Sequence, residues 1–144
     1  MNKELEDALV AKYPKIFSRV KWFEHGDGWY NIIDSLCSCL QEESNRRIRE
    51  LDKDDPEYPE KAEDLQVVAA QVKEKFGGLR FYIGFGSPEI YAMIRMAEAI
   101  STRTCEDCGG PGKTRPGGWI RTLCDSCAKA AGRNPQDRFE DEEG

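Results

Sequence analysis

Apolar side chains recur at helical spacing in two long segments of the chain, residues 29–51 and residues 88–101. In the first segment the apolar positions are Ile32 or Ile33, Leu36, Leu40 and Ile48. In the second segment they are Ile90, Met93 or Ile94, Ala97 and Ile100. Ser87 precedes Pro88, which is the order of an N-cap and a first helical residue. Both segments are therefore predicted to be helices that pack one face against a core.

A shorter helix is expected at the N-terminus. Asn2 is a good N-cap, Leu5 and Leu9 share one helical face, and Pro14 ends the segment. The Gly-Asp-Gly sequence that follows is typical of a turn. Its Asp27 also stands where it would cap the helix predicted from residue 29.

The segment between residues 65 and 86 carries two patterns at once. Residues 79–85 alternate and are rich in aromatic side chains, which predicts a strand. Gly77-Gly78 would then be the two-residue turn of a hairpin whose first strand is residues 66–76. A helical stripe that ends in glycine also fits the first half: Leu65, Val68 or Ala69, Val72 and Phe76. The hairpin is the favoured interpretation, because a lone strand leaves its backbone groups unpaired.

Composition limits the class of protein. The chain has 144 residues, of which 39% are hydrophobic and 33% charged, and its formal net charge is −6. No apolar stretch approaches the roughly 20 residues needed to span a bilayer, and the charged N-terminus lacks the apolar core of a signal peptide. We therefore expect a cytoplasmic protein with no membrane partner, whose overall field does not attract nucleic acid.

Four of the six cysteines follow the spacing C-x2-C, fifteen residues, C-x2-C: Cys105, Cys108, Cys124 and Cys127. Two intervening residues let both thiolates of a tight turn face one metal ion. Two such turns complete a tetrahedral set of ligands, whose usual occupant is one structural Zn²⁺, and such a closed set leaves no position for a substrate. The remaining pair, Cys37 and Cys39, face different directions on a helix and are expected to be buried free thiols.

The predicted elements combine into an α+β protein with three parts. Residues 1–101 form a domain of helices and a β-hairpin, within which the acidic residues 52–63, with two prolines, are an exposed linker. Residues 102–131 form a zinc ribbon, with a short hairpin between the cysteine pairs and a short helix from the second pair to Ala131. Residues 132–144 are rich in acidic side chains and are expected to be disordered.

The ribbon segment is basic although the whole chain is acidic. Between residues 101 and 133, six basic residues stand against three acidic ones, a local charge of +3, whereas residues 134–144 carry −4. Together with one tryptophan, the basic residues are candidate contacts to nucleic acid or to a protein partner: Arg103, Lys113, Arg115, Trp119, Arg121 and Lys129. Alternatively, these cations only keep the ribbon soluble, and Trp119 packs beneath the metal.

The chain offers few catalytic groups. Its single histidine, His25, leaves His-dependent nucleases, zinc hydrolases and Ser-His triads without residues that they need. A catalytic site around His25, Asp27, Trp29 and Tyr30 is the weakest alternative, because a lone histidine in a loop is more often a hydrogen-bond donor. The sequence therefore indicates that the protein is not an enzyme.

Three segments carry a resemblance to a known group of proteins: HGDGWYNIID at residues 25–34, VKEKFGGLRFY at residues 72–82, and CEDCGGPGK with GGWIRTLCDSC within residues 105–127. Over residues 1–130 the chain resembles small uncharacterised proteins encoded by tailed bacteriophages and prophages. The resemblance implies a cytoplasmic phage accessory protein with a C-terminal four-Cys zinc ribbon, and it brings no catalytic residues. The favoured function is a non-enzymatic binding module that engages, and regulates or inhibits, a host or phage protein. Nucleic-acid binding through the ribbon is the alternative.

Overall fold

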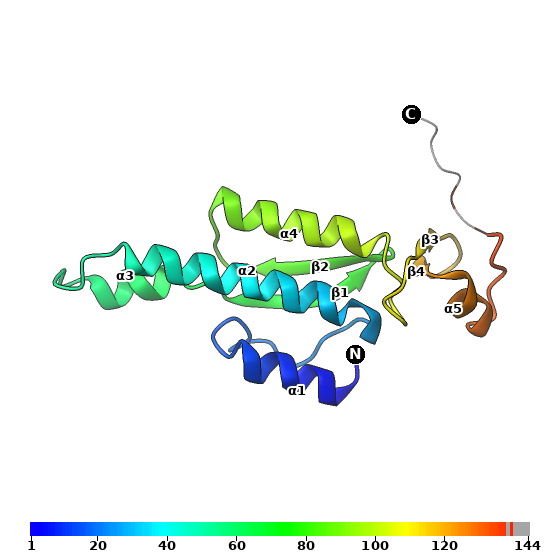
Figure 1. The fold of residues 1–144 in the computed structure, drawn as a ribbon, viewed down its shortest axis with the longest axis horizontal. Coiled ribbons are helices and arrows are strands. Elements are labelled where there is room, and N and C mark those ends of the chain that lie inside the picture. Colours follow the sequence, from blue (N-terminus) through cyan, green and yellow to red (C-terminus); the bar gives the residue numbers. More distant parts are fainter. Residues whose placement is uncertain (138, 140–144) are drawn as a thin grey trace.

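The computed structural model describes residues 1–137 and 139. Its elements are α1 (Lys3–Lys12), the 3-10 helix η1 (Asp27–Trp29), α2 (Tyr30–Arg49), α3 (Tyr58–Leu65), β1 (Ala69–Lys75), β2 (Gly78–Ile83), α4 (Pro88–Ser101), β3 (Lys113–Arg115), β4 (Arg121–Leu123) and α5 (Asp125–Ala130). Residues 1–101, here called the body, form one layered unit, and residues 102–131, here called the ribbon, lie at one end of it (Figure 1). Helices combined with two antiparallel hairpins confirm the α+β class.

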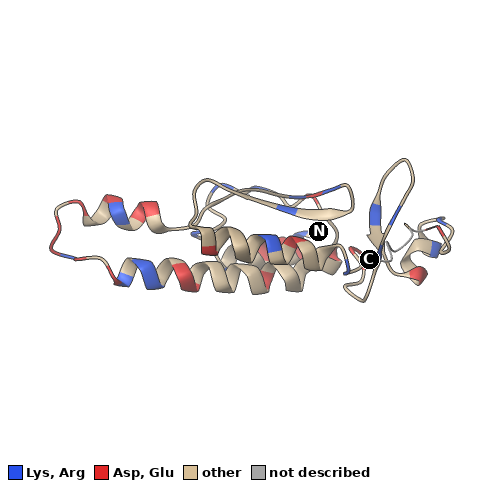
Figure 2. Ribbon diagram, turned by 90° about the horizontal axis from the view of Figure 1, so that it is seen from above, with Lys and Arg blue, Asp and Glu red and all other residues tan. Residues whose placement is uncertain are grey.

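The body is built on the antiparallel hairpin of β1 and β2. In the part of the chain that is described, α2 and α4 lie side by side against one face of this hairpin, and no helix covers the other face (Figure 2). Leu79 and Phe81 are buried, whereas Arg80 and Tyr82 between and beyond them are not. This alternation is typical of a strand with one face on the core and the other open to solvent.

The hairpin confirms the favoured interpretation of residues 65–86 but moves its turn by one residue. Lys75 pairs with Gly78, so the two turn residues are Phe76 and Gly77 rather than Gly77 and Gly78. Both have positive φ, +52° for Phe76 and +82° for Gly77. Two left-handed residues in succession define the tight turn whose twist matches that of the flanking strands. The pair of glycines therefore did not fix the register by itself.

Side chains and one outside segment close both edges of the hairpin. On the β2 edge, the backbone N–H of Leu79 donates to Ser101 Oγ at 2.8 Å, and that of Phe81 donates to Glu98 Oε2 at 3.1 Å. On the β1 edge, Glu24 donates its N–H to the carbonyl of Val72 and accepts from the N–H of Glu74. Satisfied edges remove the template that an exposed strand offers to other chains.

One continuous apolar cluster fills the body. It includes the fully buried side chains of Leu9, Ile33, Leu40 and Val72, which come from α1, α2 and β1. The predicted N-cap of α1 is confirmed, since Asn2 Oδ1 accepts from the N–H of Leu5 at 2.9 Å. The predicted cap and proline of α4 are confirmed as well.

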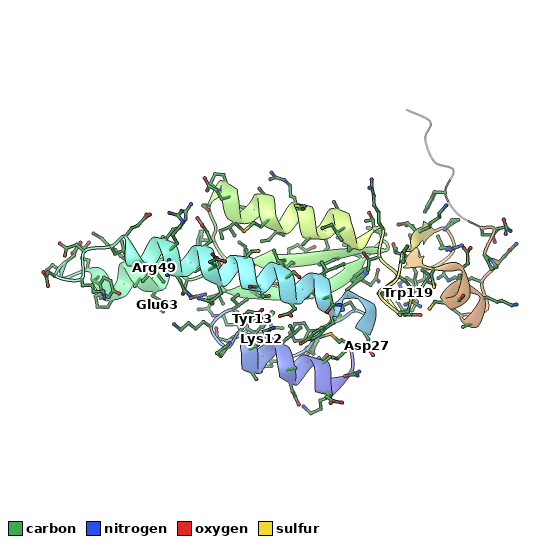
Figure 3. All side chains as sticks on the ribbon, in the orientation of Figure 1. Lys12, Tyr13, Asp27, Arg49, Glu63 and Trp119 are labelled. Atoms are coloured by element: carbon green, nitrogen blue, oxygen red, sulfur yellow. The ribbon has the colours of Figure 1, made fainter. Side chains whose placement is uncertain are left out.

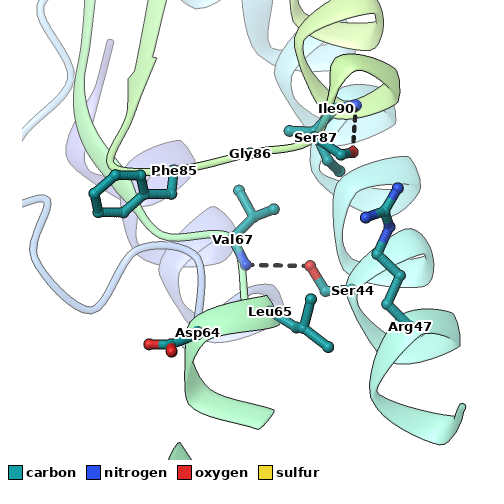
Figure 4. Close-up of a pocket in the computed structure, with 9 residues that line it drawn as sticks. All are labelled: Ser44, Arg47, Asp64, Leu65, Val67, Phe85, Gly86, Ser87 and Ile90. Carbon is teal, nitrogen blue, oxygen red and sulfur yellow. Dashed lines mark hydrogen bonds between the residues drawn. The ribbon is translucent and has the colours of Figure 1, made fainter. Parts of the chain in front are cut away.

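The segment expected to be an exposed linker is a helix in its second half. Residues 58–63 belong to α3, which folds back beside the end of α2 that projects from the molecule (Figure 1). Pro59 lies in the first turn of α3, where a proline costs no hydrogen bond, so it begins a helix instead of preventing one. At the base of this projection, Ser44 Oγ accepts from the N–H of Val67 beside a small pocket (Figure 4).

Three further expectations for the body are wrong. Ile100 is 43% exposed. In the last turn of α4 the neighbouring Ser101, not Ile100, is buried. Cys37 is a buried free thiol as expected, but Cys39 is exposed. Asp27 does not cap α2; it begins η1, and its carboxylate accepts from the backbone and side-chain N–H groups of Asn2.

Among the described residues, no helix combines the length and the apolar character that crossing a bilayer requires.

Candidate metal centre

The four cysteines predicted to bind metal meet at one point of the ribbon. The Sγ atoms of Cys105, Cys108, Cys124 and Cys127 all lie within 4.8 Å of one another. Those of Cys108 and Cys124 are 3.8 Å apart. Four sulfurs at about 2.3 Å from a central Zn²⁺ in a tetrahedron would be separated by roughly the same distance. The sulfur atoms are therefore placed to hold one metal ion.

The backbone around each cysteine pair is shaped for thiolate ligands. After the first pair, Gly109 adopts φ +80°, and the N–H of Gly110 donates to Cys108 Sγ at 3.4 Å. The second pair begins α5, where the N–H of Cys127 donates to Cys124 Sγ at 3.3 Å. This N–H lowers the pKa of the Cys124 thiol to about 7. N–H donors that stabilise thiolate favour the ionisation that metal binding needs.

The ribbon has almost no core of its own. Among the described residues, its buried apolar cluster consists of Cys105, Leu123 and Ala128. Strands β3 and β4 are three residues each, and α5 has six. A module of this size does not bury enough apolar surface to fold unaided, and a metal held by the four cysteines would supply the missing stabilisation. A four-thiolate set leaves no open coordination position, which makes the centre structural.

Direct backbone contacts hold the ribbon to the body. The N–H of Gly28 donates to the carbonyl of Glu106 at 2.7 Å, next to the first ligand. The Trp29 indole donates to the carbonyl of Thr104 at 2.9 Å, and the Thr122 hydroxyl donates to that of Gly77 at 2.6 Å. The first cysteine turn thus rests on η1, and β4 rests on the turn of the body hairpin.

The six candidate contact residues of the ribbon are in different environments. Arg115 is buried, 1% exposed, which removes it from any surface that a partner could touch. Its guanidinium donates to the carbonyls of Leu123 and Pro135 and to the carboxylate of Asp125. Arg103, Lys113 and Lys129 are exposed and Arg121 is half-buried.

Trp119 does not pack beneath the metal. Its ring is 61% exposed and lies where the ribbon meets the body (Figure 3), with the Arg121 guanidinium 5.5 Å from the ring centre. The indole N–H donates to Glu74 Oε1 of the body at 2.9 Å. Arg121 in turn is paired with Asp107 at 2.7 Å and with Glu106 at 3.4 Å. Both residues are therefore committed to the junction between ribbon and body.

The C-terminal segment is described only in part, and the expected disorder of residues 132–144 falls on residues that include 138 and 140–144, outside the described part. Within that part, Arg133 donates to the carbonyls of Pro116 and Trp119, and the Pro135 carbonyl accepts from Arg115. Residues 133–135 thus contact the ribbon.

His25 is buried and is hydrogen-bonded to the backbone. It is 6% exposed, lies beside the rings of Phe23 and Trp29, and its Nδ1 lies 2.7 Å from the Gly26 carbonyl. Burial lowers its pKa to about 4, so the ring is neutral near pH 7 and Nδ1 donates to that carbonyl. Asp27, its proposed catalytic neighbour, is instead hydrogen-bonded to Asn2.

Sequence reasoning missed Glu106, which lies between the metal ligands. Its side chain is 3% exposed, faces Arg121 and the N–H of Gly26, and has a pKa that burial raises. With His25 it borders a pocket of about 460 Å³ at the junction. No pattern in the sequence indicates this burial, because Gly26, which donates to the Glu106 carboxylate, is 80 residues away along the chain.

Comparison with protein-family models, with curated proteins and with solved structures found no match.

Proposed function

We propose that the protein is a non-enzymatic binding module, in which a structural Zn²⁺ ribbon closes one end of the body and the body engages a protein partner. The observation that carries this proposal is an apolar groove of about 450 Å³ between α2 and α4. The groove is lined by apolar side chains from both helices, among them Ile32, Leu36, Met93, Met96 and Ile100. Met96 is 67% exposed there.

The chemistry of the groove suits a helical partner segment. Two helices that lie side by side form a channel into which an amphipathic helix can lay its apolar face. Methionine side chains are flexible and polarizable, so they adapt to the shape of an incoming surface. A contiguous exposed apolar patch on a protein with 33% charged residues is a typical interaction surface.

Two further features support binding rather than catalysis. The metal centre uses all four positions for cysteine, so it has none left to activate water or hold a substrate. His25 is neutral, buried and bonded to backbone, with Asp27 turned to Asn2. In this proposal the protein acts in the bacterial cytoplasm as a phage accessory protein, and occupation of the groove regulates or inhibits the partner.

The test places a photo-crosslinking residue in the groove at position 96 and, as a control, at position 99. Ala99 is exposed on α4 but does not line the groove. We expect one defined protein adduct from position 96 in bacterial cytoplasm and none from position 99. Cys39, an exposed thiol that lines the groove, should become slower to alkylate when the partner is bound. Equal crosslinking from both positions, or unchanged alkylation, would contradict the proposal.

A further inference from the structure

Exposed aromatic rings lie in two neighbouring grooves of the body, one beside the hairpin at residues 19–22 and the other between β2 and α4. Trp22 is 61% exposed, and Tyr82 and Tyr91 are each 41% exposed. Trp22 and Tyr82 line one groove of about 350 Å³, and Tyr82 and Tyr91 line a second of about 450 Å³. Tyr82 lines both grooves, so they lie next to each other on either side of this residue and are together called the hairpin track.

Cations line this track on both sides of Tyr82. Arg19 and Lys21 line the first groove with Trp22, and Arg80 and Arg95 line the second with Tyr91. The one acidic residue in either lining is Glu98, whose Oε2 already accepts from the N–H of Phe81. The track is therefore positively charged although the chain carries −6, and it can attract an anion despite the acidic net charge.

Two details beside the track are compatible with an anionic ligand. Lys73 and Arg80 are cross-strand partners in the hairpin, and like charges directly opposite destabilise an antiparallel pair. Trp22 is held in place although its ring is exposed, since its indole N–H donates to Glu24 Oε1 at 3.0 Å. A fixed, exposed ring beside several cations is arranged to stack a flat group next to a negative charge.

We propose that the hairpin track binds single-stranded nucleic acid. Bases would stack on Trp22, Tyr82 and Tyr91, while Arg19, Lys21, Arg80 and Arg95 contact phosphates. Rings that alternate with cations along a groove are how proteins bind single strands without reading sequence. A duplex hides its base faces, so it would reach the cations alone. The track recognises phosphates and base faces, which single-stranded DNA and RNA share.

This surface differs from the groove between α2 and α4 and from the ribbon. The groove is lined by α2 and by residues of α4 that do not line the track, and the ribbon's own tryptophan is bonded to Glu74 at the junction. Trp22 and Trp119 have the same exposed fraction, 61%, so they form a matched pair of variants. Binding to the track and binding to a protein partner can therefore fail independently.

The experiment titrates the full zinc-loaded chain against a fluorescent oligothymidylate of about 12 nucleotides, with oligouridylate as a second arm, and measures anisotropy. Trp22→Ala should weaken binding about tenfold, while Trp22→Phe retains a ring and most of the affinity. Trp119→Ala, and Met96→Glu in the groove, should leave it unchanged. Raising the salt from 50 to 200 mM should weaken binding by roughly 20- to 50-fold, as expected for three or four phosphate contacts to a single strand.

Each outcome decides the proposal. Binding of either oligonucleotide that depends on Trp22 supports it, and the tighter of the two arms identifies DNA or RNA as the ligand. No binding at low salt overturns it, as does binding that is lost in Trp119→Ala but kept in Trp22→Ala. Displacement by poly-glutamate as effective as that by unlabelled oligothymidylate would also overturn it, because the track would then recognise negative charge without bases.

Discussion

The body and the ribbon are stabilised in different ways, although they are parts of one short chain. Among the described residues, eighteen buried apolar side chains form the core of the body, whereas three form that of the ribbon. The body is thus stabilised by the hydrophobic effect, whereas the ribbon depends on its contacts with the body and on the metal ion that its four cysteines are placed to hold. The difference indicates that a metal bound here would serve local order, whereas the groove between α2 and α4 and the hairpin track both belong to the body.

The largest difference between the two regions is expected when the metal is removed. Chelation, or Cys108→Ser, should cost the ribbon on the order of 10 kcal/mol and unfold it. The body should remain folded because its core contains no metal ligand. Amide hydrogen exchange resolved by residue measures this: protection should vanish over residues 102–131 and persist in β1, β2 and α2.

Cys39→Ser is the matched control, because this thiol is exposed and lies far from the cluster in sequence. It should leave one zinc per chain by elemental analysis, whereas Cys108→Ser should reduce the metal content. If the body loses protection together with the ribbon, the two regions form one cooperative unit and the comparison fails.

The next largest effect is expected in the body core at Trp29. Its ring is fully buried and its indole bonds the Thr104 carbonyl across the junction. Trp29→Ala should lower the free energy of unfolding by about 3–5 kcal/mol, from lost burial and the cavity left behind. Trp22→Ala, at an exposed ring, should change it by less than about 0.5 kcal/mol. Urea unfolding followed by circular dichroism measures both, and similar losses would mean that Trp22 is part of a core.

The features that the sequence predicted depend on residues close together along the chain, whereas those that it missed depend on the fold or on the position of a proline. The cysteine quartet, the helix at Ser87-Pro88 and the Asn2 cap depend on residues a few positions apart, so local spacing was sufficient. The burial of Arg115 depends on carbonyls at Leu123 and Pro135, which only the folded ribbon brings together. The α3 helix was missed because a proline was taken as a breaker when it stands in a first turn.

The sequence was least informative about which side chains are available on the surface for contacts with a partner. Basic residues near the cysteines looked available because the sequence is locally basic, yet Arg115 is buried and Arg121 is paired with Asp107. Trp22 and Tyr82 are 60 positions apart and line one groove only because the segment before Glu24 runs beside β1. Long-range packing of this kind leaves no trace in periodicity or spacing.

A substitution at Gly28 tests whether the contact between body and ribbon supports the metal centre. A Cβ added there would lie 2.2 Å from the Cys105 carbonyl oxygen and 2.5 Å from the Gly109 nitrogen, so the backbone of η1 or of the first cysteine turn must shift. Gly28→Ala should cost about 1–3 kcal/mol and weaken zinc retention in a chelator competition. Gly84→Ala meets nothing within 4 Å and should be close to neutral. Equal zinc retention in both variants would show that the contact between η1 and the first cysteine turn does not support the metal centre.

The smallest effect is expected in the pH dependence of the free energy of unfolding, through His25 of the body. Burial lowers the pKa of His25 to about 4, below its ordinary value of 6.5. Between these two values the unfolded chain binds a proton that the folded chain does not, so stability falls as the pH falls. From pH 7 to 5.5 this group should remove about 1 kcal/mol. In His25→Gln that contribution should be absent, so the variant's stability should fall by about 1 kcal/mol less over this interval, measured by urea unfolding with zinc in excess. An equal loss in both proteins would mean that His25 titrates normally and that its burial between Phe23 and Trp29 is not maintained in solution.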